Sequence, residues 1–467
     1  MTEDPNDVRA IRNLGPGRSL VPVALCFAIL ACDNVVNNAQ VDFDTAVNPE
    51  EPVDTIADTA CDADRLSVES GRWRRLTREQ FSNSIRDLLG VDADVSGFLK
   101  DTTLNESPFP ANVSIPPQDI DVENYYRVAE DVSERFDVSA LVSCELASSE
   151  CPRQFITDFG RRVFRRPLVE SEVDALLRVY VAGAQAIDSE GVLVHSPEAG
   201  VRLTVHAMLQ SPSFLYIAEF GSDDGEVVPL TSYEIATRLS FLLWRSTPDL
   251  ELLEAAELGA LDSVEGIVSA AERMMSDPRF TRTLVLFMKT MSGIDHVKDA
   301  TRNDIELTPV LKDAMELEAE RFLSQVFETD GSIRSLFTAP SSYPDDSLEV
   351  IYGVGGNGSR NEGFPERRGI LTNPAFLVAS QPLETFFVPT YRGGEIRKLL
   401  MCQPIPAPVI DIEFEDVGEV SNRERLRLHK DNSTCASCHE LMDPLGFALE
   451  GFDDLGRFRT EDAEGPI

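Results

Sequence analysis

The stretch Cys435-Ala-Ser-Cys438-His439 decides how the rest of the chain is interpreted. Two cysteines spaced C-x-x-C with a histidine directly after them form the attachment motif of c-type haem. The two thiols must reach the two vinyl groups of one porphyrin, and the adjacent imidazole must lie beneath the iron as its proximal ligand. A tight turn leading into a helix start would present all three groups on one side. The motif therefore predicts covalently bound haem c at Cys435 and Cys438, with His439 as the iron ligand.

A C-x-x-C pair also occurs as a redox dithiol, as a short disulfide and as half of a zinc site. A zinc site would need further ligands, and close to the motif the sequence offers only His429. A disulfide between Cys435 and Cys438, without haem, is the alternative that stands beside haem attachment.

The ligand on the other side of the iron is not evident from the motif. Met442 follows His439 by three residues, so on a helix both would share one face, whereas axial ligands approach the porphyrin from opposite faces. His429 precedes the motif across a flexible Lys-Asp-Asn-Ser-Thr stretch and has more freedom to reach the iron. We predict His429 as a candidate distal ligand, beside an open site, a distant methionine or a ligand beyond this sequence.

Composition and charge limit the class of protein. The chain has 467 residues, of which 42% are apolar, which suggests a globular protein of about three or four domains. Its formal net charge of −38 argues strongly against a nucleic-acid partner, because phosphate binding requires surfaces rich in Lys and Arg. Together with the haem motif, this leaves a redox protein or an unidentified substrate as the expected partner.

The N-terminus has the pattern of an export signal. Arg9, Arg12 and Arg18 precede an apolar run over residues 20–31, which is too short to span a membrane. The run ends at Ile-Leu-Ala before Cys32, which resembles the lipobox of bacterial lipoproteins. We expect an exported protein at the periplasm or cell surface, attached to the membrane only through a lipid on Cys32; ordinary signal-peptide cleavage is the alternative.

Export determines how the other cysteines are interpreted. Cys144 and Cys151 enclose six residues of polar character, which in an oxidising compartment predicts a local disulfide. Cys26 leaves with the signal peptide. Cys61 and Cys402 could pair with each other or stay free.

Helical periodicity and helix-start signals run through most of the chain. Thr77 with Gln80 and Thr231 with Glu234 have capping-box spacing, and Ser196-Pro197 is a typical helix start. The fold class is mainly α: several small helical modules in series with loop-rich connections. The expected divisions are a signal peptide at 1–31, an acidic disordered tether at 32–70, helical modules at 71–140, 150–220 and 228–353, and a haem-attachment module at 364–467.

A long helix is expected from Thr308-Pro309 onward, and it carries four acidic residues. No histidine joins them at a metal-binding spacing, so we interpret them as a solvated face. The four residues are Asp313, Glu316, Glu318 and Glu320.

The order of segments resembles large secreted proteins of planctomycetes and myxobacteria that consist of serial domains of unknown function and often accompany cytochrome c modules. Residues 381–395 depart from that pattern, and relatives continue into a further module beyond Ile467. The resemblance implies an exported, haem-linked protein without implying a reaction. The matching segments are Arg74-Arg75-Leu76-Thr77 to Leu89-Gly90, Phe164-Arg165-Arg166-Pro167-Leu168, Leu239-Ser240-Phe241-Leu242-Leu243-Trp244, Arg367-Arg368-Gly369-Ile370-Leu371-Thr372, and residues 435–457.

Two functions from different classes follow. The first is an exported, lipid-anchored c-type haem protein that transfers electrons, alone or within an oxidative enzyme system. The second is a surface lipoprotein without haem that serves as a binding or scaffold module. No G-x-S-x-G, H-E-x-x-H or P-loop motif occurs, so no hydrolase is indicated, and the sequence leaves open whether the protein is an enzyme.

Overall fold

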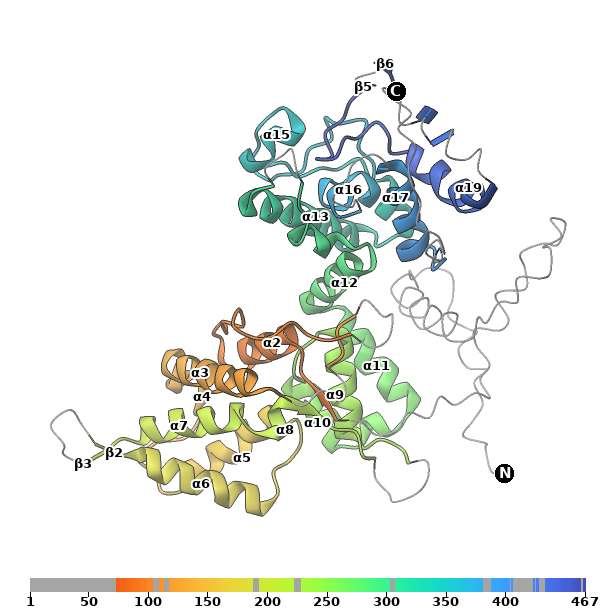
Figure 1. The fold of residues 1–467 in the computed structure, drawn as a ribbon. Coiled ribbons are helices and arrows are strands. Elements are labelled where there is room, and N and C mark those ends of the chain that lie inside the picture. Colours follow the sequence, from red (N-terminus) through yellow and green to blue (C-terminus); the bar gives the residue numbers. More distant parts are fainter. Residues whose placement is uncertain are drawn as a thin grey trace, which may run out of the picture. The chain divides into compact units, whose positions relative to one another are not determined.

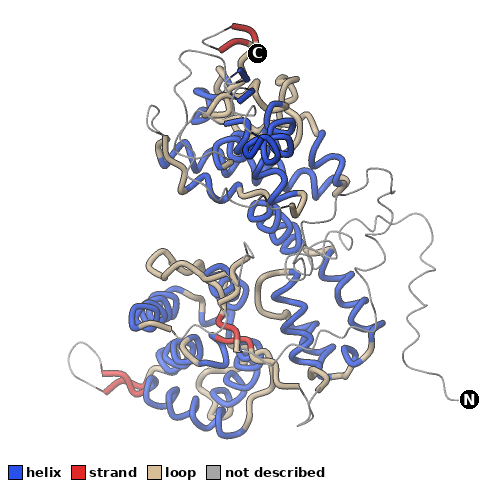
Figure 2. The backbone as a smooth tube through the Cα atoms, turned by 45° about the vertical axis from the view of Figure 1, so that its right-hand side comes forward, coloured by secondary structure: helices blue, strands red, loops and turns tan. Residues whose placement is uncertain are grey.

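The computed structural model of the chain is mainly α-helical, which confirms the predicted fold class (Figure 1). Short strands in the described residues pair into three two-stranded antiparallel sheets (Figure 2). None of the helices among these residues is both long and apolar enough to cross a bilayer. The structure describes residues 73–103, 109–112, 117–187, 193–221, 228–302, 307–380, 388–403, 405, 423–424, 426–427, 433–462 and 465–467.

Several predicted features lie outside the described residues. These are the signal peptide, the acidic tether, the lipidation site Cys32, the cysteines Cys26 and Cys61, and the candidate distal ligand His429. Each of them stays a prediction.

The described chain divides into two compact units, Arg65–Leu286 and Phe287–Ile467. The division falls inside helix α12 (Pro278–Met291), within the segment 228–353 that the sequence suggests as one module. The four-module division of the sequence analysis stays a prediction.

The unit Arg65–Leu286 is a group of helices whose buried apolar side chains form a cluster reaching from Leu76 to Phe241. Helices α6 and α7 lie side by side in it (Figure 1). Its strands are β1 (Arg74–Arg75) paired with β4 (Tyr216–Ile217), and β2 (Gln185–Ile187) paired with β3 (Leu193–His195). Its helices are α2 (Arg78–Leu89), α3 (Asp119–Arg135), α4 (Val138–Leu141), α5 (Cys151–Phe164), α6 (Glu170–Ala184), α7 (Pro197–Leu209), α8 (Pro212–Leu215), α9 (Ser232–Leu243), α10 (Leu250–Glu257), the 3₁₀ turn η3 (Ala260–Asp262) and α11 (Val264–Met275).

The predicted helix starts are confirmed by their hydrogen bonds. The hydroxyl of Thr77 accepts from the backbone N–H of Gln80 at 3.2 Å, and the side chain of Gln80 accepts from the N–H of Thr77 at 3.0 Å. Thr231 and Glu234 form the same reciprocal pair at the start of α9. These bonds satisfy backbone donors that have no partner within the helix, which is why the helices begin at these residues.

Arg165 connects the end of α5 to the short helix α8 and strand β4. Its buried guanidinium donates to the carbonyl oxygens of Ser213 at 2.8 Å, Phe214 at 3.1 Å and Tyr216 at 2.7 Å. Burial lowers the pKa of Arg165 to about 9. Tyr216 in turn pairs with Arg75 across β4 and β1. A structural role therefore explains Arg165 in the Phe164–Leu168 motif.

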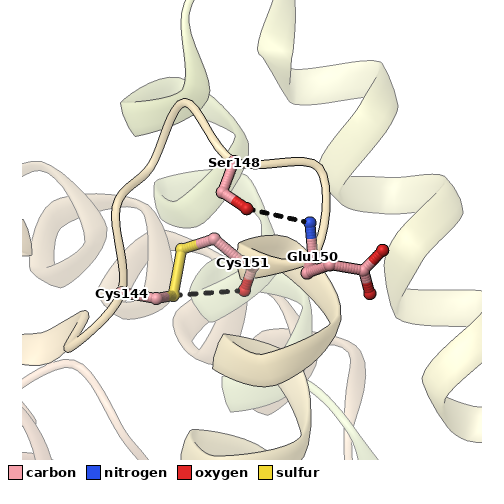
Figure 3. The surroundings of a disulfide bond; sticks show 4 residues. All are labelled: Cys144, Ser148, Glu150 and Cys151. Atoms are coloured by element: carbon pink, nitrogen blue, oxygen red, sulfur yellow. Dashed lines mark hydrogen bonds between the residues drawn. A yellow bond between two sulfur atoms is a disulfide. The ribbon is translucent and has the colours of Figure 1, made fainter.

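The predicted disulfide between Cys144 and Cys151 is confirmed (Figure 3). The Cα atoms of the two cysteines are 5.5 Å apart, and Cys151 is the first residue of α5. Within the enclosed loop, Ser148 Oγ accepts from the backbone N–H of Glu150 at 3.4 Å (Figure 3). The bond therefore anchors a short polar loop to the start of a helix. Cys402 is also disulfide-bonded, so it is not free.

Replacing Cys144 and Cys151 together by alanine is expected to destabilise the unit Arg65–Leu286 by somewhat less than ~3 kcal/mol, because a short loop loses less entropy on closure than a fifteen-residue one. Both tryptophans, Trp73 and Trp244, lie in this unit, so denaturant unfolding followed by tryptophan fluorescence measures the change. Two free thiols in a non-reduced peptide digest of the wild type would contradict the prediction.

The unit Phe287–Ile467 is organised around the long helix α13 (Pro309–Thr329), which begins at the predicted Thr308-Pro309 cap. Near the C-terminal end of this unit, strands β5 (Glu461–Asp462) and β6 (Gly465–Pro466) form a short antiparallel pair. The other helical elements are the 3₁₀ turns η4 (Ile294–Lys298), η5 (Asp346–Leu348) and η6 (Ile370–Thr372), the helices α14 (Ile333–Thr338), α15 (Glu349–Tyr352), α16 (Pro374–Ala379), α17 (Val388–Glu395) and α19 (Ser433–Phe447), and the π-helical turn η8 (Ile396–Leu400).

The interpretation of the acidic residues on α13 as a solvated face is wrong for Glu318. This side chain is buried at 1% exposure, because it lies on the same face of the helix as the core residues Met315 and Phe322. Its carboxylate accepts from the backbone N–H of Tyr343 at 3.1 Å and from the hydroxyl of Tyr352. Burial raises the pKa of Glu318. Of the other three, Asp313 is exposed and pairs with Lys298. Glu316 and Glu320 are partly buried and pair with the buried Lys289, and Glu316 also pairs with Lys298.

Candidate haem-attachment site

Helix α19 carries the whole C-x-x-C-H motif. The helix runs without interruption from Ser433 to Phe447, so Cys435, Cys438 and His439 are spaced i, i+3 and i+4 on it. Residues at this spacing are neighbours on one helical face. The three groups are therefore presented on one side, by the helix itself and not by a turn that precedes it.

Both thiols of the motif are free in the structure. Cys435 is buried and Cys438 is half-buried. The structure therefore does not contain the alternative disulfide between Cys435 and Cys438. Among the residues that the structure describes, no group of three or more His, Cys, Asp or Glu side chains could hold a metal ion, which is the arrangement that a structural zinc site requires.

Asp443 holds the imidazole ring of His439. The Nδ1 atom of His439 lies 3.0 Å from Oδ1 of Asp443, one helical turn further along α19. Both side chains are buried, Asp443 at 1% exposure. Because a carboxylate only accepts hydrogen bonds, Nδ1 carries the hydrogen and donates it. Nε2 is then the ring nitrogen whose lone pair suits a metal ion.

Thr390 holds the same carboxylate from a different helix. Its hydroxyl donates to Oδ1 of Asp443 at 2.8 Å, and its side chain is buried. Thr390 was not predicted as a site residue, because it lies 53 residues before Asp443 in a segment that departs from the family pattern. Asp443 lies within the matching segment 435–457, and its i+4 spacing from His439 is a signal by which sequence alone could have predicted this contact.

Two glycines allow α17 and α19 to approach closely enough for this contact. A Cβ atom on Gly446 would lie 1.6 Å from the carbonyl oxygen of Pro389, and one on Gly393 would lie 1.9 Å from that of Met442. Real Cβ atoms do not come so close to other atoms, so a side chain at either position would push the two helices apart. The glycines thereby place Thr390 beside Asp443.

Arg392 fixes α17 to the segment that follows α19. Its guanidinium is almost completely buried and donates to the carbonyl oxygens of Leu449 at 3.0 Å, Phe452 at 2.7 Å and Asp453 at 2.6 Å. Burial lowers the pKa of Arg392 to about 9, so the side chain stays charged at neutral pH. This Arg positions the helix that carries Thr390.

Met442 lies on the same continuous helix as His439, three residues further on. It is half-buried, and its sulfur lies 3.3 Å from where a Cβ atom of Gly394 in α17 would be. The side chain of Met442 is therefore directed at the neighbouring helix.

The chemistry of this donor set fits covalent haem. Free thiols are the groups that attach to porphyrin vinyl carbons, and an imidazole whose Nδ1 donates to a carboxylate is of the type that ligates iron through Nε2. The residues that would hold haem are Cys435, Cys438 and His439.

The fold and this donor set define a mainly α-helical protein with two free thiols and an imidazole on one face of a C-terminal helix. Four family models, each described as a protein of unknown function, match in series: PSD3 (DUF1587) at residues 74–138, PSD5 (DUF1595) at 151–219, PSD4 (DUF1592) at 230–354 and PSCyt3 (DUF1588) at 367–462. No curated protein and no solved structure matches the chain.

The PSCyt3 match contains α17 and α19, and thus every residue of the site described above. The expected series of domains of unknown function, one of them cytochrome-like, is confirmed. The planctomycete or myxobacterial origin stays a prediction.

Proposed function

We propose that the chain is an exported c-type haem protein that transfers electrons, with haem held by Cys435, Cys438 and His439. The observation that carries the proposal is the pair of free thiols beside a carboxylate-held imidazole on one face of α19, within the region that matches the PSCyt3 model. Haem that stays with the polypeptide after denaturation, and that depends on both cysteines, is the test.

Each thiol would add across one vinyl group of haem. Its sulfur would bond to the vinyl carbon next to the ring and its hydrogen would go to the terminal carbon, so the addition would consume no oxidant or reductant. His439 would ligate iron through Nε2, while Asp443 holds the hydrogen on Nδ1 and fixes the orientation of the ring. When bound, haem supplies a reversible one-electron couple.

Location and partner form part of the same proposal. The predicted signal peptide exports the chain, and a lipid on Cys32 holds it at the membrane surface. The partner that a haem protein outside the cytoplasm implies is a redox protein or a substrate. The net charge of −38 disfavours a nucleic-acid partner.

Replacing Met442 by alanine is expected to leave the axial ligation of haem unchanged. Met442 shares a helix face with His439, so its sulfur cannot reach the opposite side of the porphyrin. The near-infrared absorption band of methionine-ligated ferric haem, if the wild type shows it, should therefore persist in Met442→Ala. Loss of the band in this variant alone would contradict the geometric argument.

A further inference from the structure

We propose that Asp443, clamped by Thr390, is the positioning residue of His439: it makes His439 a strongly electron-donating iron ligand and thereby lowers the reduction potential of the haem. The inference rests on the proposed function and concerns two residues to which the motif assigns no role.

The geometry of the clamp is set from two directions. The i+4 spacing on α19 places the Asp443 carboxylate 3.0 Å from Nδ1 of His439, and Thr390 on α17 holds the same oxygen at 2.8 Å. In the part of the chain that the structure describes, the imidazole of His439 contacts the carboxylate of Asp443, and no Lys or Arg forms an ion pair with this carboxylate. The negative charge of this buried carboxylate is therefore directed at the imidazole.

The electronic consequence follows from the low polarity around the pair. A buried carboxylate that accepts from Nδ1–H shifts electron density toward Nε2, and this makes the ring a more basic ligand. The interaction is stronger here than in water, because the surroundings have a low dielectric constant. A more basic ligand stabilises ferric iron, which has the higher charge, more than ferrous iron. The potential is then lower than with a neutral acceptor at this position.

The decisive variant is Asp443→Asn in the full chain loaded with haem. The amide keeps the shape and the accepting oxygen but removes the charge, so the midpoint potential is expected to move to a more positive value. Glu440→Gln is the matched control. Glu440 is exposed and adjacent to His439, so this variant also removes one negative charge, but from a side chain in contact with solvent. Its potential is expected to shift much less, because water screens the charge.

Thr390→Val separates the electronic effect from simple loosening of the site. It keeps the carboxylate charge and removes one hydrogen bond to it, so more of that charge acts on His439, and the potential should stay the same or become more negative. A positive shift of similar size in Thr390→Val and Asp443→Asn would overturn the proposal, since both would then act by disordering the site. Equal potentials in Asp443→Asn and Glu440→Gln would also overturn it.

A measurement on haem-free protein distinguishes failure of this inference from failure of the proposed function. The nitrogen chemical shifts of His439 in histidine-labelled protein, assigned by their loss in His439→Gln, should show the hydrogen on Nδ1 in the wild type. In Asp443→Asn this preference should weaken. If wild-type protein never binds haem but shows this tautomer and its loss, the proposed function fails and the role of Asp443 stands. If haem is bound and the tautomer does not depend on Asp443, the inference fails alone.

Discussion

Replacing both Cys435 and Cys438 by serine is expected to abolish covalent haem completely. Serine hydroxyls do not form thioethers, and the structure offers no other free cysteine among the described residues to replace them. After production together with cytochrome c maturation factors, wild-type protein should give a band that stains for haem peroxidase activity on a denaturing gel. The double variant should give no stained band.

The Cys144→Ser, Cys151→Ser double variant is the matched control, because it also replaces two cysteines by serine but lies in the other unit of the chain. It should keep the haem stain. If wild-type protein made with maturation factors never stains, the proposed haem function is wrong. The scaffold interpretation would then take its place.

Replacing Arg392 by methionine is expected to destabilise the unit Phe287–Ile467 by about 3–5 kcal/mol, because buried carbonyl oxygens would lose charged hydrogen-bond donors that water cannot replace. Methionine fills much of the volume of the side chain but donates nothing. The affected carbonyls belong to Leu449, Phe452 and Asp453, directly after α19. The loss of stability should therefore be concentrated around α19.

Hydrogen exchange measured by mass spectrometry is the suitable readout. Trp73 and Trp244 both lie in the unit Arg65–Leu286, so tryptophan fluorescence does not report on the helices around Arg392 directly. Peptides from residues 433–462 should exchange at least a hundredfold faster in Arg392→Met, since each ~1.4 kcal/mol corresponds to a factor of ten. Unchanged exchange in these peptides would show that Arg392 is not needed to hold α17 to this segment.

Lys398→Met serves as the control for Arg392→Met. Lys398 follows α17 in the π-helical turn η8, and its side chain is 58% exposed and 3.6 Å from Glu395. Exposed pairs of this kind contribute at most about 1 kcal/mol. Exchange in residues 433–462 should stay close to that of the wild type.

Features formed between residues near in sequence could be predicted without a structure. The caps at Thr77 and Thr231 and the disulfide that closes the loop from Cys144 to Cys151 are of this kind. Their geometry is set within one or two turns of chain, so residue type and spacing are sufficient to predict them. The same holds for the C-x-x-C-H motif, which is identified from residue type and spacing alone, without the fold around it.

The environment of the motif was decided only by tertiary structure. Thr390 reaches Asp443 across 53 residues, and Arg392 reaches carbonyl oxygens about sixty residues away, because Gly393 and Gly446 let two helices meet without side chains between them. Glu318 is polar by sequence yet buried, because it shares a helix face with core residues and finds donors on a distant loop. Such contacts depend on which surfaces pack together, and helical periodicity specifies a face but not the surface that covers it.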